Sequence, residues 1–344
     1  MTNTAGHRRR TSRAARTAMG AAAVALVAGG GFLLAGNATA GEEASAADAS
    51  GTPFAPYVDT SLQPSYDLVA SAGRTGVQEY NLAFVTSGGG CVPKWGGGQE
   101  LEDDPVARQI PDLRAEGGDV RVSFGGANGT ELGTACDSAD ELAAAYGKVV
   151  DTFDLTKIDL DIEGAALPDT RANERRAKAV AALQRSHQDL DVSYTLPVMP
   201  EGLTAPGVKL LENAEANGVR VSAVNIMAMD YGSSYDGDMG TYATQAATAA
   251  HEQVAAALGL DDEAAWKALA VTPMIGVNDV NVEVFTPEDA AQVRAFADEH
   301  GMGRLSMWSG TRDKPCPGGP KDQADPTCSS IEQSPDDFSK AFAG

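Results

Sequence analysis

The most regular alternation of apolar and polar positions lies in residues 157–164, K-I-D-L-D-I-E-G. Three aliphatic residues alternate there with Asp159, Asp161 and Glu163, and side chains on a strand alternate between its faces, so the three acids share one face. Like charges in a row repel. If that face is buried, the carboxyl groups must share protons, and one becomes a proton donor near neutral pH. The alternative is an edge strand whose acids face water.

The same reading of the whole chain predicts alternating strands and helices. We expect strands at 54–58, 79–85, 119–124, 157–163, 190–196, 219–229, 270–277 and 304–308. We expect helices at 66–72, 105–115, 138–153, 171–188, 208–217, 243–258, 287–300 and 336–342, with a short extra helix at 262–269. This alternation predicts an α/β protein with parallel strands, and eight units in about 290 residues fit a (β/α)8 TIM barrel. A doubly wound open sheet is the alternative, although no G-x-G-x-x-G follows the first expected strand.

The first 40 residues are predicted to be an export signal. They contain five arginines and no acid, then an apolar stretch at 18–35, then A-T-A at 38–40, which matches an A-x-A cleavage site. A retained membrane anchor is the alternative, and the export route, Sec or twin-arginine, stays open. We expect residues 41–52 to be a disordered leader and 53–344 to be the catalytic barrel. The protein is therefore predicted to be secreted and, once the signal is cleaved, free of the membrane.

Composition limits the partners of the protein. The chain has 344 residues and a net charge of −22, so it is not expected to bind nucleic acid or an anionic membrane through charge. The acidity fits a neutral or cationic ligand, or serves solubility alone. We expect a monomer.

Four cysteines are present, Cys91, Cys136, Cys316 and Cys328, and they allow three pairings. Cys316 and Cys328 lie in one loop rich in proline, glycine and aspartate and are expected to pair locally. Cys91 is then left to pair with Cys136. The spacing matches no metal motif, so a zinc site is not expected.

Catalytic residues of a barrel lie at the C-terminal ends of its strands. Those ends, with the residues just after them, carry Tyr57, Phe84, Ser123, Gly125, Gly126, Asp161, Glu163, Met229, Asp230, Tyr231, Asn278 and Trp308. The histidines fall in expected helices or in the signal, which excludes a Ser-His-Asp triad and a histidine-rich metal site. A carboxylate site for Mg²⁺ or Ca²⁺ is an open alternative, but we expect neither metal nor cofactor. Carboxylates beside aromatic residues are typical of sugar chemistry.

These residues resemble the glycoside hydrolase family 18 enzymes, the chitinase family, whose signature on the fourth strand is D-x-x-D-x-D-x-E. The last three acids match Asp159, Asp161 and Glu163, whereas Thr156 replaces the first. The S-F-G-G at 123–126 resembles the family's S-x-G-G, and the M-A-M-D-Y at 227–231 resembles its M-x-M/Y-D-Y. Trp308 matches the tryptophan that ends the eighth strand.

The resemblance implies a retaining, substrate-assisted hydrolysis of chitin or N-acetylglucosamine oligosaccharides. Glu163 would protonate the glycosidic oxygen while the acetamido carbonyl of the sugar attacks C1 and forms an oxazolinium. Asp161 would orient the acetamido N–H and share a proton with Asp159. Tyr231 would donate a hydrogen bond to the acetamido oxygen, and Asp230 would hold the sugar.

Other candidates are expected in supporting positions. Trp308 would form the floor under the sugar ring, and Met229 would be core or pocket wall. Ser123, Gly125 and Gly126 serve either close backbone packing or substrate contact. Trp95, in the loop after the second strand, either stacks on a more distant sugar or shields the Cys91 region. No long insertion follows the seventh strand, which predicts an open groove and endo-acting cleavage.

Three rival functions stay open. The first is an endo-β-N-acetylglucosaminidase that cuts N-glycan cores with the same acids. The second is a chitinase-like lectin, although the presence of Glu163 favours hydrolysis. The third is a structural or inhibitory barrel without affinity for sugar.

Overall fold

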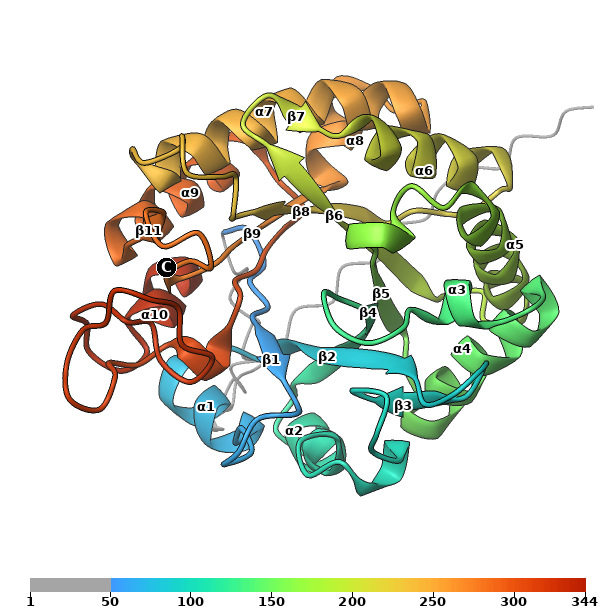
Figure 1. The fold of residues 1–344 in the computed structure, drawn as a ribbon, viewed down its shortest axis with the longest axis horizontal. Coiled ribbons are helices and arrows are strands. Elements are labelled where there is room, and N and C mark those ends of the chain that lie inside the picture. The colour runs from blue at the N-terminus through green and yellow to red at the C-terminus, as the bar shows by residue number, and fades with distance from the viewer. Residues whose placement is uncertain (1–50) are drawn as a thin grey trace, which may run out of the picture. The chain divides into compact units, whose positions relative to one another are not determined.

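The computed structural model describes residues 51–344, in which eight parallel strands form one curled sheet (Figure 1). The predicted signal and most of the predicted leader lie outside the described residues. In spatial order the strands are β1 (Tyr57–Asp59), β2 (Glu79–Ser87), β4 (Asp119–Gly125), β5 (Lys157–Asp161), β6 (Asp191–Met199), β8 (Ala223–Ala228), β9 (Leu269–Pro273) and β12 (Arg304–Leu305).

Backbone hydrogen bonds close this sheet between its first and last strands. The N–H of Ala55 donates to the carbonyl of Leu305 at 2.9 Å, and the N–H of Tyr57 donates to the carbonyl of Met307 at 3.0 Å. Phe54 and Leu305 also form a parallel bridge. The predicted (β/α)8 barrel is therefore confirmed, and the open doubly wound sheet is wrong.

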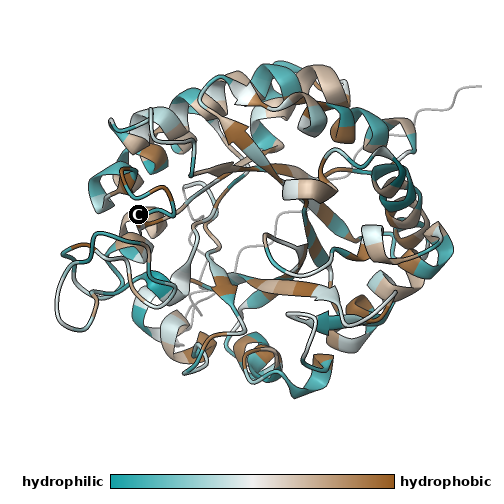
Figure 2. Ribbon diagram, in the orientation of Figure 1, coloured by the Kyte–Doolittle hydropathy of each residue, from teal (hydrophilic) through white to brown (hydrophobic). Residues whose placement is uncertain are grey.

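Helices surround the barrel, as Figure 1 shows. They are α1 (Leu68–Thr75), α2 (Ile110–Ala115), α4 (Ala139–Phe153), α5 (Thr170–Ser186), α6 (Ala205–Ala216), α7 (Met239–Leu258), α9 (Pro287–His300) and α10 (Asp337–Ala343), with α3 (Leu132–Ala135) and α8 (Asp262–Lys267) as short additions. In Figure 2 the strands are largely brown or pale, whereas the helices carry much teal. On β5 the aliphatic Ile158 and Leu160 are fully buried, and the acids that alternate with them on this strand, Asp159 and Asp161, are buried as well.

Local capping signals place several helix ends where the sequence predicts them. Thr286 and Asp289 form a capping box before α9, and Gly301 ends that helix in the left-handed region at φ 65°. Ser138 accepts a hydrogen bond from the N–H of Glu141 at the start of α4.

The structure corrects three expectations. Short antiparallel strands, missed because two- and three-residue strands carry no periodicity, occur at β3 (Pro93–Trp95), β7 (Gly202–Leu203), β10 (Gly276–Val277) and β11 (Val284–Phe285). The predicted 219–229 and 304–308 strands are shorter, since their terminal apolar residues pack in loops. Thr52, assigned to the leader, is buried and donates its N–H to Asp298 at 2.7 Å, so the ordered barrel includes it.

Both predicted disulfides, Cys91–Cys136 and Cys316–Cys328, are present. Within the described part of the chain, no helix has the length and apolar character needed to cross a membrane.

Candidate active site

Asp159 lies at the centre of the barrel, fully buried, and accepts hydrogen bonds from hydroxyl groups on three other strands. Ser123 on β4 and Tyr57 on β1 donate to Oδ2 at 2.7 and 3.0 Å. Ser193 on β6 donates to Oδ1 at 2.6 Å, and the hydroxyl of Thr195 lies 2.9 Å from the same oxygen. The parallel register places Ser123 and Ser193 opposite Asp159, so sheet pairing itself builds this site.

A second layer of hydrogen bonds orients the protons of these hydroxyl groups. The Asn225 amide donates to the hydroxyl oxygens of Tyr57 at 3.2 Å and Thr195 at 3.0 Å. Its own carbonyl oxygen accepts from Thr272 at 2.8 Å. The oxygens of Tyr57 and Thr195 therefore accept from Asn225 and direct their protons toward Asp159. A carboxylate that only accepts is the ionised form, so this arrangement favours negative charge on Asp159.

Asp161, two residues further along β5, has a different environment. It is buried, and among residues 51–344 its Oδ1 atom finds no hydrogen-bond partner. Burial raises the pKa of Asp161 well above its usual value, and the charges of Glu163 and Asp159 raise it further. Both effects favour the protonated form of Asp161, whereas the hydroxyl groups around Asp159 favour its ionised form.

Glu163 follows the end of β5 and reaches the groove. Burial raises its pKa, and the nearby charge of Asp230 raises it further. A raised pKa favours the protonated form of the carboxyl group, and this form is required to protonate a leaving group.

Asp230, just beyond β8, is fixed by the turn between β10 and β11. Its carboxylate accepts the N–H of Val280 at 2.9 Å, and its backbone lies in the left-handed region at φ 52°. Two residues later, Gly232 donates its N–H to the carboxylate of Glu283 at 2.7 Å. The hairpin thus fixes the position of the charged group beside Glu163.

A groove of about 540 Å³ lies over these acids. Trp308, Phe84 and Tyr57 form an aromatic cluster in its wall, with the Trp308 and Phe84 rings stacked at 5.5 Å between centroids and 19° between planes. Such a face stacks on sugar rings.

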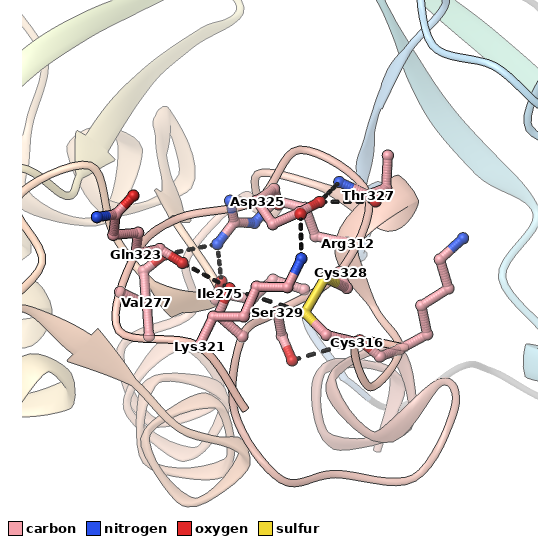
Figure 3. Close-up of a disulfide and its surroundings, with 12 residues drawn as sticks. Ile275, Val277, Arg312, Cys316, Lys321, Gln323, Asp325, Thr327, Cys328 and Ser329 are labelled. Carbon is pink, nitrogen blue, oxygen red and sulfur yellow. Dashed lines mark hydrogen bonds and ion pairs between the residues drawn. A yellow bond between two sulfur atoms is a disulfide. The ribbon is translucent and has the colours of Figure 1, made fainter. Parts of the chain in front are cut away.

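The loop closed by Cys316–Cys328 forms another part of the wall, through Ala324 and Pro326. Arg312 connects this loop to the barrel (Figure 3). Its guanidinium donates to the carbonyls of Ile275 and Asp325, both at 2.9 Å.

Seven of the predicted site residues line the groove: Tyr57, Phe84, Asp161, Glu163, Met229, Asp230 and Trp308. Asp159 and Ser123 lie behind it, in hydrogen-bond contact with each other. The structure therefore assigns Ser123 to the support of Asp159 and not to contact with substrate.

The two glycines serve close packing, one of the alternatives left open. A Cβ at Gly125 would lie 2.0 Å from the carbonyl oxygen of Asp161, and one at Gly126 would lie 2.7 Å from the Phe84 ring. Both have positive φ, 105° and 83°. Their lack of a side chain lets β4 and Phe84 approach the acids.

Three residues predicted to contact substrate are absent from the lining of the groove. Trp95 is 2% exposed, donates its indole N–H to the carbonyl of Leu101 and packs on Phe153, so it belongs to the core. Asn278 is fully buried, and its amide donates to the carbonyls of its own turn. Tyr231 is 6% exposed and packs against Tyr235 and Tyr242, and its buried hydroxyl has no hydrogen-bond partner among residues 51–344.

Arg312 and Pro326 also line the groove and were missed, because the segment after β12 carries no periodic pattern and reaches the site only in the folded chain. Asp59, at the end of β1, and Asp279, after β10, line the groove as well. Asn225 and Thr195 could have been found, because each lies on an expected strand in a buried, polar position.

No group of three potential metal-ligating side chains occurs within residues 51–344. Among the carboxylates of the site, Asp159 accepts hydrogen bonds from hydroxyl groups and Asp230 accepts one from a backbone N–H.

No family model matches the chain. It is 38% identical over 277 residues to the probable bifunctional chitinase/lysozyme of Escherichia coli, and the matched region covers 76% of this chain and 31% of that protein. It is 36% identical over 278 residues to endochitinase 11 of Metarhizium anisopliae, which covers 76% of this chain and 52% of that protein. The chain thus spans about a third and about half of these two relatives. The catalytic domain of a hyperthermophilic chitinase from Pyrococcus furiosus superposes with a TM-score of 0.76 at 35% identity, covering 85% of this chain and 96% of that domain.

Proposed function

Because the chain belongs to the chitinases of glycoside hydrolase family 18, we propose that it hydrolyses β-1,4 bonds between N-acetylglucosamine units. The observation that carries this proposal is the environment of Glu163. This acid faces a groove with an aromatic wall, and burial together with Asp230 raises its pKa. A protonated carboxyl group beside a sugar-binding face is suited to cleave a glycosidic bond.

In the proposed mechanism, Glu163 donates its proton to the glycosidic oxygen as the bond to C1 breaks. The carbonyl oxygen of the substrate's own acetamido group forms the new bond to C1 and gives an oxazolinium. Glu163, now ionised, takes a proton from a water molecule that attacks C1 from the face that the leaving group left. The bond between C1 and the acetamido oxygen breaks in this step, which restores the acetamido group. The product keeps the β configuration.

Asp161 takes the positioning part of this mechanism. It lies between Asp159 and Glu163 on one face of the strand end, where it can accept the acetamido N–H and offset the positive charge of the oxazolinium. Met229 and Asp230 line the groove beside it. The Tyr231 hydroxyl, buried and without a partner among residues 51–344, would donate a hydrogen bond to the acetamido oxygen. Trp308 would lie against the sugar ring that reacts.

An endo-acting mode is supported by the short segment between β9 and α9, which holds only the β10–β11 hairpin and leaves the groove open. Secretion after cleavage near residue 40 is part of the proposal, since the two disulfides persist in an oxidising compartment.

The test uses the chitin hexamer and reads products by mass and by proton NMR. We expect N-acetylglucosamine oligomers of intermediate length, first seen as the β-anomer. The fully deacetylated hexamer, which lacks the acetamido nucleophile, should stay intact. Release of the inverted anomer would contradict the mechanism. Cleavage of an N-glycan core with an intact hexamer would favour the endo-β-N-acetylglucosaminidase instead.

A further inference from the structure

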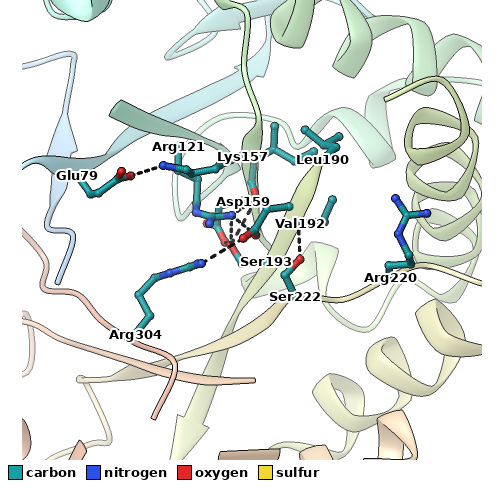
Figure 4. A network of polar contacts seen from close by, with 12 residues as sticks. Glu79, Arg121, Lys157, Asp159, Leu190, Val192, Ser193, Arg220, Ser222 and Arg304 are labelled. Atoms are coloured by element: carbon teal, nitrogen blue, oxygen red, sulfur yellow. Dashed lines mark hydrogen bonds and ion pairs between the residues drawn. The ribbon is translucent and has the colours of Figure 1, made fainter. Parts of the chain in front are cut away.

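A cluster of charged residues lies near Asp159 (Figure 4), toward the N-terminal ends of β4, β6 and β12. Arg121 on β4 is almost fully buried, and its guanidinium donates to the Asp191 carboxylate at 2.9 Å. Arg304 on β12 lies 3.4 Å from the other oxygen of Asp191. None of these residues lines the groove over the catalytic acids.

The cluster connects to Asp159 through one hydroxyl group. Arg121 donates to the backbone carbonyl of Ile158 at 2.8 Å and lies 3.4 Å from the Ser193 oxygen. Ser193 in turn donates to Asp159 at 2.6 Å. Because the Ser193 oxygen accepts from Arg121, the Ser193 hydroxyl proton points toward Asp159. The positive charge of Arg121 thus strengthens the hydrogen bond from Ser193 to Asp159.

The charges of the cluster do not balance without Asp159. Two guanidinium groups face one carboxylate, that of Asp191, which leaves one positive charge over. Lys157, also in Figure 4, is already paired with Glu79 and Asp119. The pKa of Arg304 is lowered, mainly by burial and also by the positive charge of Arg121. The negative charges of Asp191 and Asp159 raise this pKa and partly offset the shift. Buried charges persist where they are compensated, and an ionised Asp159 supplies the missing charge.

We propose that Arg121 and Arg304 are positioning residues that hold negative charge on Asp159 and so keep the shared proton on Asp161, an inference that rests on the proposed function. With the proton there, Asp161 is neutral beside Glu163 in the free enzyme. When the oxazolinium forms, the proton can pass from Asp161 to Asp159, which places the negative charge on Asp161. In the free enzyme, Arg121 and Arg304 favour the opposite arrangement, with the negative charge on Asp159.

Arg304 is the residue to change, because it is partly exposed and makes one long ion pair, whereas Arg121 makes several buried contacts. The groups that face Asp159 are Tyr57 from β1, Arg121 from β4, Asp161 from β5, Asp191 from β6 and Arg304 from β12. In Arg304→Met one of the two cations is lost, so ionising the Asp159–Asp161 pair becomes harder. The acidic limb of the kcat/KM profile should move to higher pH by about 0.5–1 unit, and kcat/KM should fall about three- to tenfold.

Two variants serve as controls. Arg304→Lys keeps the charge and should retain the acidic limb of the parent. Arg220→Met removes an exposed arginine that lies away from the cluster in Figure 4 and donates to the carbonyl of Gln188, and it should leave the profile unchanged. Far-ultraviolet circular dichroism and the thermal midpoint establish that each variant is folded.

A double-mutant cycle separates charge from structure. In an Asp159→Asn background the negative charge is gone, so Arg304→Met should cost less than twofold. An equal cost in both backgrounds, or an acidic limb that does not move in Arg304→Met, would overturn the inference. If Asp159→Asn is inactive, the acidic limb alone decides. A parent protein that cleaves no chitin oligomer would refute the proposed function instead, which keeps the two failures distinct.

Discussion

Asp159 and Asp161 lie two residues apart on one face of β5, yet their environments are opposite. Asp159 is surrounded by hydroxyl groups that donate to it, whereas an oxygen of Asp161 lacks a partner among residues 51–344 and burial raises the pKa of its carboxyl group. These environments favour a proton on Asp161 and a negative charge on Asp159, which accepts hydrogen bonds from three other strands. The third acid, Glu163, then acts as the proton donor.

The pH dependence of Glu163 gives a first prediction. Glu163 must be protonated to act, so kcat/KM falls as pH rises through its pKa. Burial raises that pKa, and Asp230 raises it further. In Asp230→Asn the charge is removed, so the alkaline limb should move to lower pH by about 0.5–1 unit. An alkaline limb that stays in place or moves upward would show that Asp230 does not act on Glu163 through its charge.

Tyr231 gives a second prediction, since its buried hydroxyl has no hydrogen-bond partner among residues 51–344. Tyr231→Phe should lower kcat/KM about 10- to 100-fold, because the acetamido oxygen of the substrate would lose a hydrogen bond. The variant Tyr57→Phe removes a hydroxyl that donates to Asp159 and should lower kcat by about tenfold or more. A change of less than about threefold in Tyr231→Phe would mean that its hydroxyl does not reach the substrate.

The aromatic wall gives a third. Trp308→Ala should lower kcat/KM for the hexamer about 10- to 100-fold, since the substrate loses a stacking face. Trp95→Phe is the control: this buried ring should affect the thermal midpoint and leave KM as in the parent. A raised KM in Trp95→Phe with an unchanged midpoint would return Trp95 to the substrate site.

The disulfide loop gives a fourth. Replacing Cys316 and Cys328 by serine frees the loop that carries Ala324 and Pro326, so KM for the hexamer should rise several-fold. Stability should fall by about 3 kcal/mol on the loop-closure estimate. The same change at Cys91 and Cys136 should lower stability without this effect on KM, because neither residue lines the groove. Equal KM values in the two double variants would contradict a role for the loop in binding.

The sequence carries enough periodicity to predict the barrel and the acidic strand. Alternation at 157–163 places three acids on one face because strand geometry leaves no other choice. The order of strands and helices along the chain locates the C-terminal end of each strand. Three aromatic residues predicted at these ends, Tyr57, Phe84 and Trp308, do line the groove.

What sequence could not give is the direction of side chains in turns. Asp230 and Tyr231 are neighbours, but the left-handed backbone at Asp230 turns one toward Glu163 and the other toward Tyr242. Asn278 follows a strand, yet its amide satisfies the carbonyls of its own turn. Asp191 and Arg304 are 113 residues apart, so their ion pair appears only once the barrel has closed.

The most direct test of the account is the product pattern of Glu163→Gln beside the parent, both with the chitin hexamer and both shown to be folded. Gln keeps the size and polarity of Glu163 but has no proton to give. The account predicts shorter oligomers from the parent, a loss of at least about 1,000-fold in the rate of the variant, and retained binding of the hexamer. Hydrolysis by Glu163→Gln at the parent rate would contradict it.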